Sequence, residues 1–145
     1  MEPAVEKPVL PPSMPGLDTY LGIDLVSATA DRVELSWTVR PELTQPYGIV
    51  HGGTYCTAVE SSASVGAAIW FGERNEGGRV VGVSNTTDFY RAVTAGVLTA
   101  VATPVHRGRS QQVWRVDITD EDERLVAQGQ VRLQNLTDSH RGPGH

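Results

Sequence analysis

The chain of 145 residues has room for one domain with a buried core, and its formal net charge is −5 at pH 7. Because it contains no block of lysine or arginine, this acidic balance argues against nucleic acid as a partner. The opening "MEPAVEKPVLPPSMPG" lacks the basic and apolar regions of a signal peptide, and no stretch has the ~20 apolar residues that span a bilayer. We therefore expect a soluble, cytoplasmic protein with no membrane segment.

Both ends of the chain have the composition of tails. Residues 1–15 hold five prolines, which fix φ and remove backbone donors, so an extended and loosely held segment is expected. The last nine residues, "TDSHRGPGH", contain no apolar side chain. We predict a flexible N-terminal tail over 1–15, a single domain over 16–136 and a flexible C-terminal tail over 137–145.

Alternation of apolar and polar residues predicts the strands. In "DRVELSWTVR", Val33, Leu35 and Trp37 alternate with polar residues, the period expected of a strand with one buried face. Later stretches repeat the pattern and are separated by the turn sequences "RAVTAG", "RGRS" and "DEDE". The predicted strands are residues 33–40, 80–90, 96–106, 111–119 and 125–136, with 23–28 as a short strand that pairs with 33–40.

Only residues 53–71 predict a long helix. Outside the face predicted to be buried, most residues of this helix are small, as a helix needs when other structure closes around it on more than one side. One helix and five or six strands predict an α+β fold, in which a curved antiparallel sheet wraps around a central helix. The tryptophans at positions 37, 70 and 114 are expected in the core. The residues predicted to share the buried helix face are Cys56, Val59, Ala63, Ala67 and Trp70.

One carboxylate, Glu60, stands inside this helix, with no other charged residue between His51 and Glu73. A solvated side chain is the commoner explanation for any single Glu. An ordinary surface helix, however, carries several charged residues along its exposed face. Because this helix has no such face, a partly buried and functional Glu60 is favoured. The pair Gly52 and Gly53 opens the helix, where backbone amides favour negative charge. A bare glycine pair is more often only a tight entry to a helix.

The spacing of these residues matches a known family. Gln45 lies six residues before the "HGG" that begins at His51, and Glu60 lies nine residues after that histidine. This arrangement resembles the hot-dog-fold acyl-CoA thioesterases, in the branch that includes the phenylacetate-pathway, 4-hydroxybenzoyl-CoA and 1,4-dihydroxy-2-naphthoyl-CoA thioesterases. The resemblance covers residues 17–136. It implies a hot-dog fold, with the sheet wrapped around the long helix, and an active site where two subunits meet.

The resemblance implies a role for each matching residue. Glu60 would be the catalytic carboxylate, either as nucleophile on the thioester carbonyl or as general base for water. The backbone N–H of Gly52 or Gly53 would hold the developing oxyanion, a contribution of roughly 10²–10³ in rate for one donor. Gln45 and His51 would orient the thioester or its leaving group. Ser64 would hold the hydrolytic water.

The implied substrate is an aryl or medium-chain acyl-CoA. Its acyl group would lie against the predicted strand "VVGVSNTTDFY", with Val83, Ser84 and Asn85 as contacts. Coenzyme A is polyanionic, so an acidic protein needs local arginines to bind it, although solvated turn charge explains such arginines equally well. The candidates are Arg91 and the turn residues Arg107, Gly108 and Arg109 in "HRGRS".

No cofactor and no metal are expected. The four histidines are scattered, with no cysteine or acid at ligand spacing. A thioester is already activated, so a carboxylate and well-placed amides suffice for its hydrolysis. The single cysteine, Cys56, has no base near it in the sequence, which favours a buried helix residue over a nucleophile.

Two other functions stay open from the sequence. The same fold could bind acyl-CoA without turnover, as a regulatory or lipid-sensing module, although the complete set of matched residues favours an enzyme. A hot-dog dehydratase ranks third, because it would need a catalytic histidine paired with an acid in a different arrangement. The resemblance also implies a homo-oligomer, with a dimer as the minimum and a tetramer expected.

Overall fold

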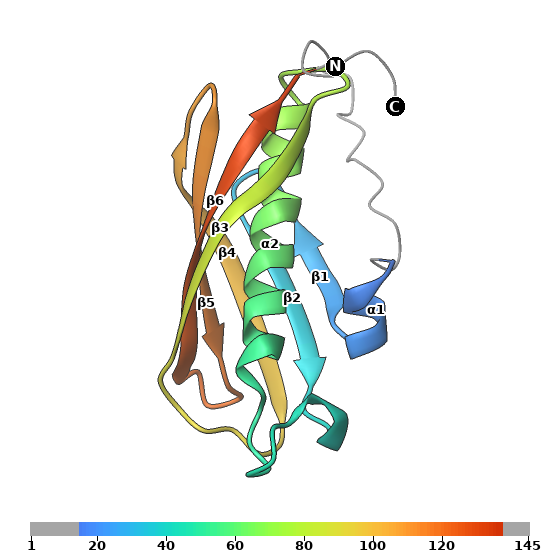
Figure 1. Ribbon diagram of the computed structural model, residues 1–145, viewed down its shortest axis with the longest axis vertical. Helices are drawn as coiled ribbons and strands as arrows, with labels where there is room; N and C mark the ends of the chain where they lie inside the picture. Colours follow the sequence, from blue (N-terminus) through green and yellow to red (C-terminus); the bar gives the residue numbers. More distant parts are fainter. Residues whose placement is uncertain (1–14, 138–145) are drawn as a thin grey trace, which may run out of the picture.

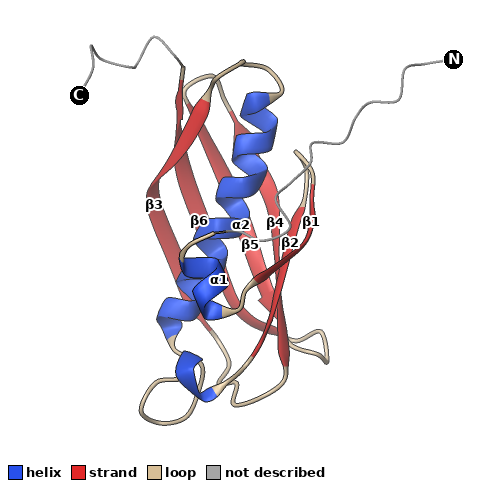
Figure 2. Ribbon diagram, turned by 90° about the vertical axis from the view of Figure 1, so that its right-hand side faces the viewer, coloured by secondary structure: helices blue, strands red, loops and turns tan. Residues whose placement is uncertain are grey.

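A long helix lies across one face of a curved antiparallel sheet in the computed structural model, which describes residues 15–137 (Figures 1 and 2). The predicted tails lie outside the described residues, apart from Pro15 and Thr137. The elements in chain order are α1 (Leu17–Leu21), β1 (Asp24–Ala28), β2 (Val33–Thr38), the 3₁₀ turn η1 (Pro41–Leu43), α2 (Gly52–Gly72), β3 (Arg79–Phe89), β4 (Val97–Arg107), β5 (Gln111–Thr119) and β6 (Leu125–Leu136).

The six strands form one sheet in the order β1-β2-β4-β5-β6-β3. The predicted strands and the predicted helix are all confirmed, including the pairing of the short first strand with β2. Neither α1 nor η1 was predicted from the sequence. The strand order leaves β1 and β3 at the two edges, and β3 pairs only with β6 among the described strands. Within residues 15–137, neither α-helix has both the length and the apolar character needed to span a membrane.

Small residues bring α2 close to the sheet. A Cβ at Gly66 would lie 2.6 Å from the ring of Trp114 on β5, and a Cβ at Gly129 on β6 would lie 2.6 Å from Val59. Both approaches are closer than carbon atoms tolerate, so glycine is required where helix and strand meet. This close packing explains why the helix sequence is rich in Gly, Ala and Ser.

The buried stripe of α2 differs from the predicted one. Cys56 and Trp70 are only half-buried, so the expectation that Trp70 lies in the core was wrong, whereas Trp37 and Trp114 are buried as predicted. The stripe runs through small and polar residues that carry little hydrophobic signal in the sequence. Its buried members are Thr54, Tyr55, Ala58, Val59, Ser62, Ala63, Gly66, Ala67 and Phe71.

The short helix α1 rests against α2 through a buried carboxylate. Asp18 is 9% exposed, and its Oδ1 accepts a hydrogen bond of 2.8 Å from Ser61 Oγ. Burial raises the pKa of the Asp18 carboxyl above its ordinary value of 3.8, and the hydrogen bond from Ser61 offsets this only in part. Because the folded-state pKa lies above the unfolded-state pKa, this carboxyl stabilises the native state at pH values below the unfolded-state pKa. That stabilisation is lost as the pH rises through the folded-state pKa.

Replacing Asp18 by Asn should therefore raise the melting temperature by a few degrees at neutral pH. The amide keeps an acceptor for Ser61 but removes the buried charge. The difference from wild type should narrow as the pH falls and the native carboxyl takes up its proton. Thermal unfolding followed by circular dichroism measures both effects. The same substitution at the exposed Asp24 is the control, and a lower melting temperature for Asp18→Asn at pH 7 would contradict this account.

Candidate active site

His51 caps the N-terminus of α2. Its backbone is extended, and its Nδ1 accepts the N–H of Gly53 at 2.8 Å. Because Nδ1 is an acceptor, the neutral ring carries its proton on Nε2, which is left as a donor. The N–H of Gly52 has no acceptor among the described residues, so this amide is the one available at a helix end that favours negative charge.

A pocket with aromatic walls lies beside this helix end. Its volume is about 270 Å³. The Phe89 ring fills the space that a side chain at position 52 would need, since a Cβ there would lie 2.6 Å from Phe89 Cε2. Burial raises the pKa of Tyr55 to about 12, so its hydroxyl stays neutral. The pocket brings together three of the predicted residues, Gln45, Gly52 and Arg91, with Ile49, Val50, Tyr55, Phe89, Tyr90 and Ala92.

Glu60 projects from the middle of α2 toward β3 and is half-buried, as predicted. Its Oε2 accepts a hydrogen bond of 3.1 Å from Asn85 Nδ2. Ser64, one turn further along, is also half-buried, and its hydroxyl has no protein partner within residues 15–137. Glu60 also lines a shallow pocket of about 280 Å³ together with Leu17, Cys56, Thr57 and Ser61.

Helix geometry separates Glu60 from the glycine amides of its own chain. Glu60 follows Gly52 by eight positions along α2, and a rise of 1.5 Å per residue separates them by about 12 Å along the axis. One thioester carbonyl cannot contact both groups at that spacing. Within one chain, the predicted site residues therefore form two separate groups, one at the helix end and one at its middle.

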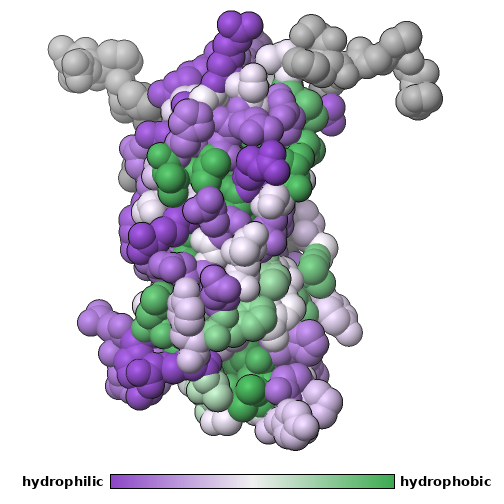
Figure 3. All heavy atoms as spheres, turned by 60° about the vertical axis from the view of Figure 1, so that its left-hand side comes forward, coloured by the Kyte–Doolittle hydropathy of each residue, from purple (hydrophilic) through white to green (hydrophobic). Residues whose placement is uncertain are grey.

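The three predicted contacts on β3 do not share a face. The strand register jumps between Gly82 and Ser84, so Val83 is the extra residue of a β-bulge. Only Asn85 contacts α2, whereas Ser84 lines a polar groove of about 410 Å³ on the opposite face of the sheet. Figure 3 brings that outer face of the sheet forward, and hydrophilic side chains cover most of it, with hydrophobic groups in separate patches.

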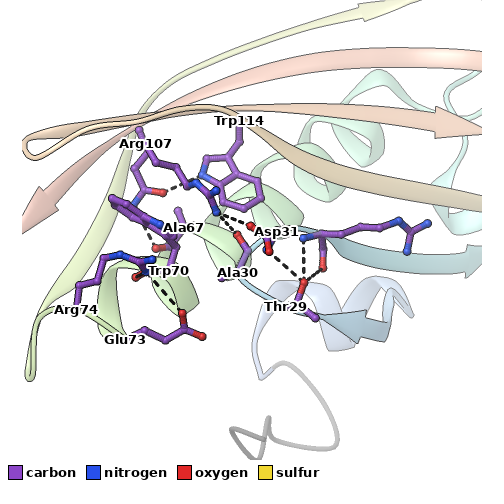
Figure 4. Close-up of polar contacts among 11 residues, drawn as sticks. Thr29, Ala30, Asp31, Ala67, Trp70, Glu73, Arg74, Arg107 and Trp114 are labelled. Atoms are coloured by element: carbon purple, nitrogen blue, oxygen red, sulfur yellow. Dashed lines mark hydrogen bonds and ion pairs between the residues drawn. The ribbon is translucent and has the colours of Figure 1, made fainter. Parts of the chain in front are cut away.

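Arg107 holds parts of the fold together at the other end of α2 (Figure 4). Its Nη1 lies 2.8 Å from both the carbonyl oxygen of Ala30 and Oδ1 of Asp31 in the β1–β2 turn. Its guanidinium lies 5.5 Å from the centre of the Trp70 ring, which Arg74 approaches to 4.6 Å. These contacts explain why Trp70 is only half-buried, and they occupy a side chain that the sequence analysis assigned to coenzyme A.

The rest of the β4–β5 turn is shaped by a buried amide. Asn135 Nδ2 donates to the carbonyl oxygens of Gly108 at 2.9 Å and Arg109 at 3.2 Å. The turn follows Arg107, beside the C-terminal part of α2, and lies away from the pocket that contains Arg91. Both Arg91 and Arg109 are exposed, and their side chains make no hydrogen bond or ion pair to the described part of the chain.

Gly82 on β3 was not predicted as a site residue. A Cβ at this position would overlap Glu60 Oε1, so the glycine gives the carboxylate its place. A glycine inside a strand often marks a bulge or a close approach, and Gly82 marks both. That signal was present in the sequence.

The fold and the sequence assign the chain to a family. Residues 47–127, more than half of the chain, match the model of the thioesterase superfamily. The chain therefore belongs to the thioesterase superfamily, and its fold is the hot-dog fold expected from the resemblance.

Relatives with similar sequences cover most of the chain. Rv1847 of Mycobacterium tuberculosis is 47% identical over 137 residues, 94% of this chain and 97% of the relative. Its solved structure matches with a TM-score of 0.78 over 83% of this chain and 95% of that one.

Two further relatives have names that state an activity. The 1,4-dihydroxy-2-naphthoyl-CoA hydrolase of Listeria monocytogenes is 36% identical and covers 77% of this chain and 88% of its own length. The solved structure of thioesterase HI1161 from Haemophilus influenzae is 30% identical, covers 86% of each chain and has a TM-score of 0.79. Family and relatives together support thioester hydrolysis as the class of reaction.

The contacts of Arg107 and Arg109 predict different effects on stability. Arg107→Ala should lower the free energy of unfolding by about 1–2 kcal/mol, because it removes two hydrogen bonds of a charged group and a contact with an indole ring. Arg109→Ala is the matched control and should leave stability unchanged. Urea denaturation of the two variants measures the difference, and equal midpoints would contradict the structural role of Arg107.

Proposed function

We propose that the protein hydrolyses an acyl-CoA thioester to the free acid and coenzyme A, with Glu60 as the catalytic carboxylate. The observation that carries this proposal is the setting of Glu60. It is the only charged residue of α2, it is half-buried beside a mainly apolar hollow, and an amide on β3 holds it. A carboxylate in such surroundings is typical of a reactive group rather than of a solvated helix face.

Two reaction steps fit a carboxylate at this place. Glu60 either attacks the thioester carbonyl, forming a mixed anhydride as the thiolate leaves, or takes a proton from a water molecule that attacks instead. In the first case water then hydrolyses the anhydride and regenerates the carboxylate. The hydroxyl of Ser64, one turn along the helix, has no partner among residues 15–137 and is suited to hold that water.

The oxyanion donors are assigned to the helix end. The N–H of Gly52 is available, whereas the N–H of Gly53 is bonded to His51, so Gly52 is the better donor of the two. The Nε2 proton of His51 would orient the thioester. Gln45 Oε1 accepts the N–H of Tyr47, which leaves the amide nitrogen of Gln45 to donate to the substrate.

A dimer would bring the two groups together. Edge strand β3 is 11 residues long and has no neighbour on its outer side in the described structure. Three apolar side chains on it are about half exposed, Val81 at 45%, Val83 at 50% and Phe89 at 53%. A long edge strand with exposed apolar side chains is normally paired or covered, and a second copy of this chain would pair with it. Pairing at β3 would set Glu60 of one subunit against the partner's Gly52; a tetramer built from such dimers is the expected assembly.

The pocket at the helix end is assigned to the acyl group. Aromatic walls from Tyr55, Phe89 and Tyr90 favour an aryl group over a medium-length alkyl chain, and a volume of about 270 Å³ accommodates one or two fused rings. The name of the Listeria relative, a hydrolase of an aryl-CoA, supports the same choice. The exposed Arg91 and Arg109 are the candidates for contact with the phosphates of coenzyme A.

Glu60→Gln should lower the rate of thiol release by about 10²–10⁴ while acyl-CoA still binds. The assay is release of free coenzyme A from benzoyl, hydroxybenzoyl, naphthoyl, phenylacetyl and medium-chain thioesters. Glu73→Gln, just past the end of α2, is the matched control and should keep full activity. An unchanged rate for Glu60→Gln would remove this residue from the mechanism. Binding without release by the wild type would instead favour the binding-module function.

A site shared between subunits predicts complementation of two inactive variants. Gly52→Pro removes the backbone N–H at the first helix position, which tolerates proline. Gly52→Ala keeps the N–H and adds the same Cβ against Phe89, so it is the control for the steric effect. Co-refolding Gly52→Pro with Glu60→Gln should restore about a quarter of the wild-type rate, since half of the dimers are mixed and each has one intact site. No recovery would mean that both groups act from one subunit.

A further inference from the structure

The bulge on β3 turns two residues toward the helix that a regular strand would place on opposite faces. Side chains alternate along a strand, so positions 82 and 85 would normally point opposite ways. Gly82 is aligned with Leu133 and Ser84 with Arg132, so Val83 is an extra residue that shifts the alternation. As a result, both Gly82 and Asn85 approach Glu60.

Asn85 is bonded entirely within the protein. Its Nδ2 donates to Glu60 Oε2 and to the carbonyl oxygen of Cys56, both at 3.1 Å. Its Oδ1 accepts the hydroxyl of Thr87 at 2.7 Å. Turning this amide over would set its oxygen against the Glu60 carboxylate and the Cys56 carbonyl, so these two acceptors keep the nitrogen on their side. The hydroxyl of Thr87 holds the other end of the amide, its oxygen, and so limits the movement of Asn85 against the carboxylate.

Gly82 leaves open the space that the carboxylate occupies. The Glu60 side chain has three rotatable bonds, and its Oε1 occupies the space that a Cβ at position 82 would take. The contact at Gly82 and the hydrogen bond from Asn85 act on different oxygens of the same group. Together they select one orientation of the carboxylate.

We infer that Gly82, Asn85 and Thr87 are positioning residues that hold the Glu60 carboxylate in its reactive orientation. This inference rests on the proposed function, because it assigns Asn85 a task that acts through Glu60 and not through contact with the substrate. A catalytic group held in one orientation reacts faster than one that samples several, without binding the substrate more tightly. The positioning residues therefore affect kcat and leave KM unchanged.

Thr87→Val provides the most selective test. The substitution keeps the shape of the side chain but removes its hydroxyl, so the oxygen of the Asn85 amide loses its donor and the amide is held less firmly against Glu60. We expect kcat to fall about five- to tenfold with unchanged KM and an unchanged melting temperature. Thr87→Ser retains the hydroxyl and should restore kcat.

Gly82→Ala tests the second contact. The new Cβ would displace the free end of the Glu60 side chain, which moves at little cost to folding. We expect kcat to fall by more than tenfold while the melting temperature stays close to that of the wild type. A normal kcat for this variant would show that the carboxylate does not need the space at Gly82.

A double-mutant cycle separates positioning from a general structural effect. In the Glu60→Gln background, Thr87→Val should have no further effect on kcat, because the group it positions is gone. An equal further loss in that background, or wild-type kcat for Thr87→Val alone, would overturn the inference while leaving the thioesterase activity in place. Absence of hydrolysis by the wild type overturns the proposed function and the inference with it.

Discussion

The close approach of α2 to the sheet is the constraint on which the candidate site depends. Glycines at the helix–strand contacts with Trp114 and Val59 leave no room for side chains, so the helix lies directly on β5 and β6. This close packing of α2 on the sheet places β3 near enough for Asn85 to donate to Glu60 and to the carbonyl oxygen of Cys56. A larger residue at the contacts would lift the helix and lengthen these hydrogen bonds. The small residues that make the helix look featureless in the sequence therefore set the geometry of the only charged group on it.

The length of the helix determines how the chemistry is divided. The available amide of Gly52 lies at its start and the carboxylate of Glu60 more than two turns later, a separation of about 12 Å along the axis. No change of side-chain rotamer brings both to one carbonyl carbon. In the proposed mechanism a single chain would supply half of each of two sites, and two-fold pairing is the simplest way to complete both. The exposed apolar side chains on edge strand β3, next to Glu60, mark the edge where such pairing would act.

Much of the fold could be predicted because its signals are local. The alternation in β2 and the charge-free helix around Glu60 each follow from residues near one another in the sequence, and so does the half-buried state of that carboxylate. What could not be predicted depends on contacts between distant segments. The bulge at Val83 puts Gly82 and Asn85 on the same face of β3, although regular alternation would put them on opposite faces. Trp70 has the spacing of a core residue, but Arg107, far along the chain, lies over its ring.

Strand β3 links the positioning of Glu60 to assembly. Its inner face carries the asparagine that holds the carboxylate, while its outer edge has no neighbour among the described strands. A strand bonded on one side opens more readily than one bonded on both, because fewer hydrogen bonds oppose the motion. A second copy paired along this edge would steady the strand and therefore the amide of Asn85. In a lone subunit the orientation of the carboxylate would be less restricted. Assembly would then contribute twice to catalysis, by supplying the partner's amide and by fixing the acid that works with it.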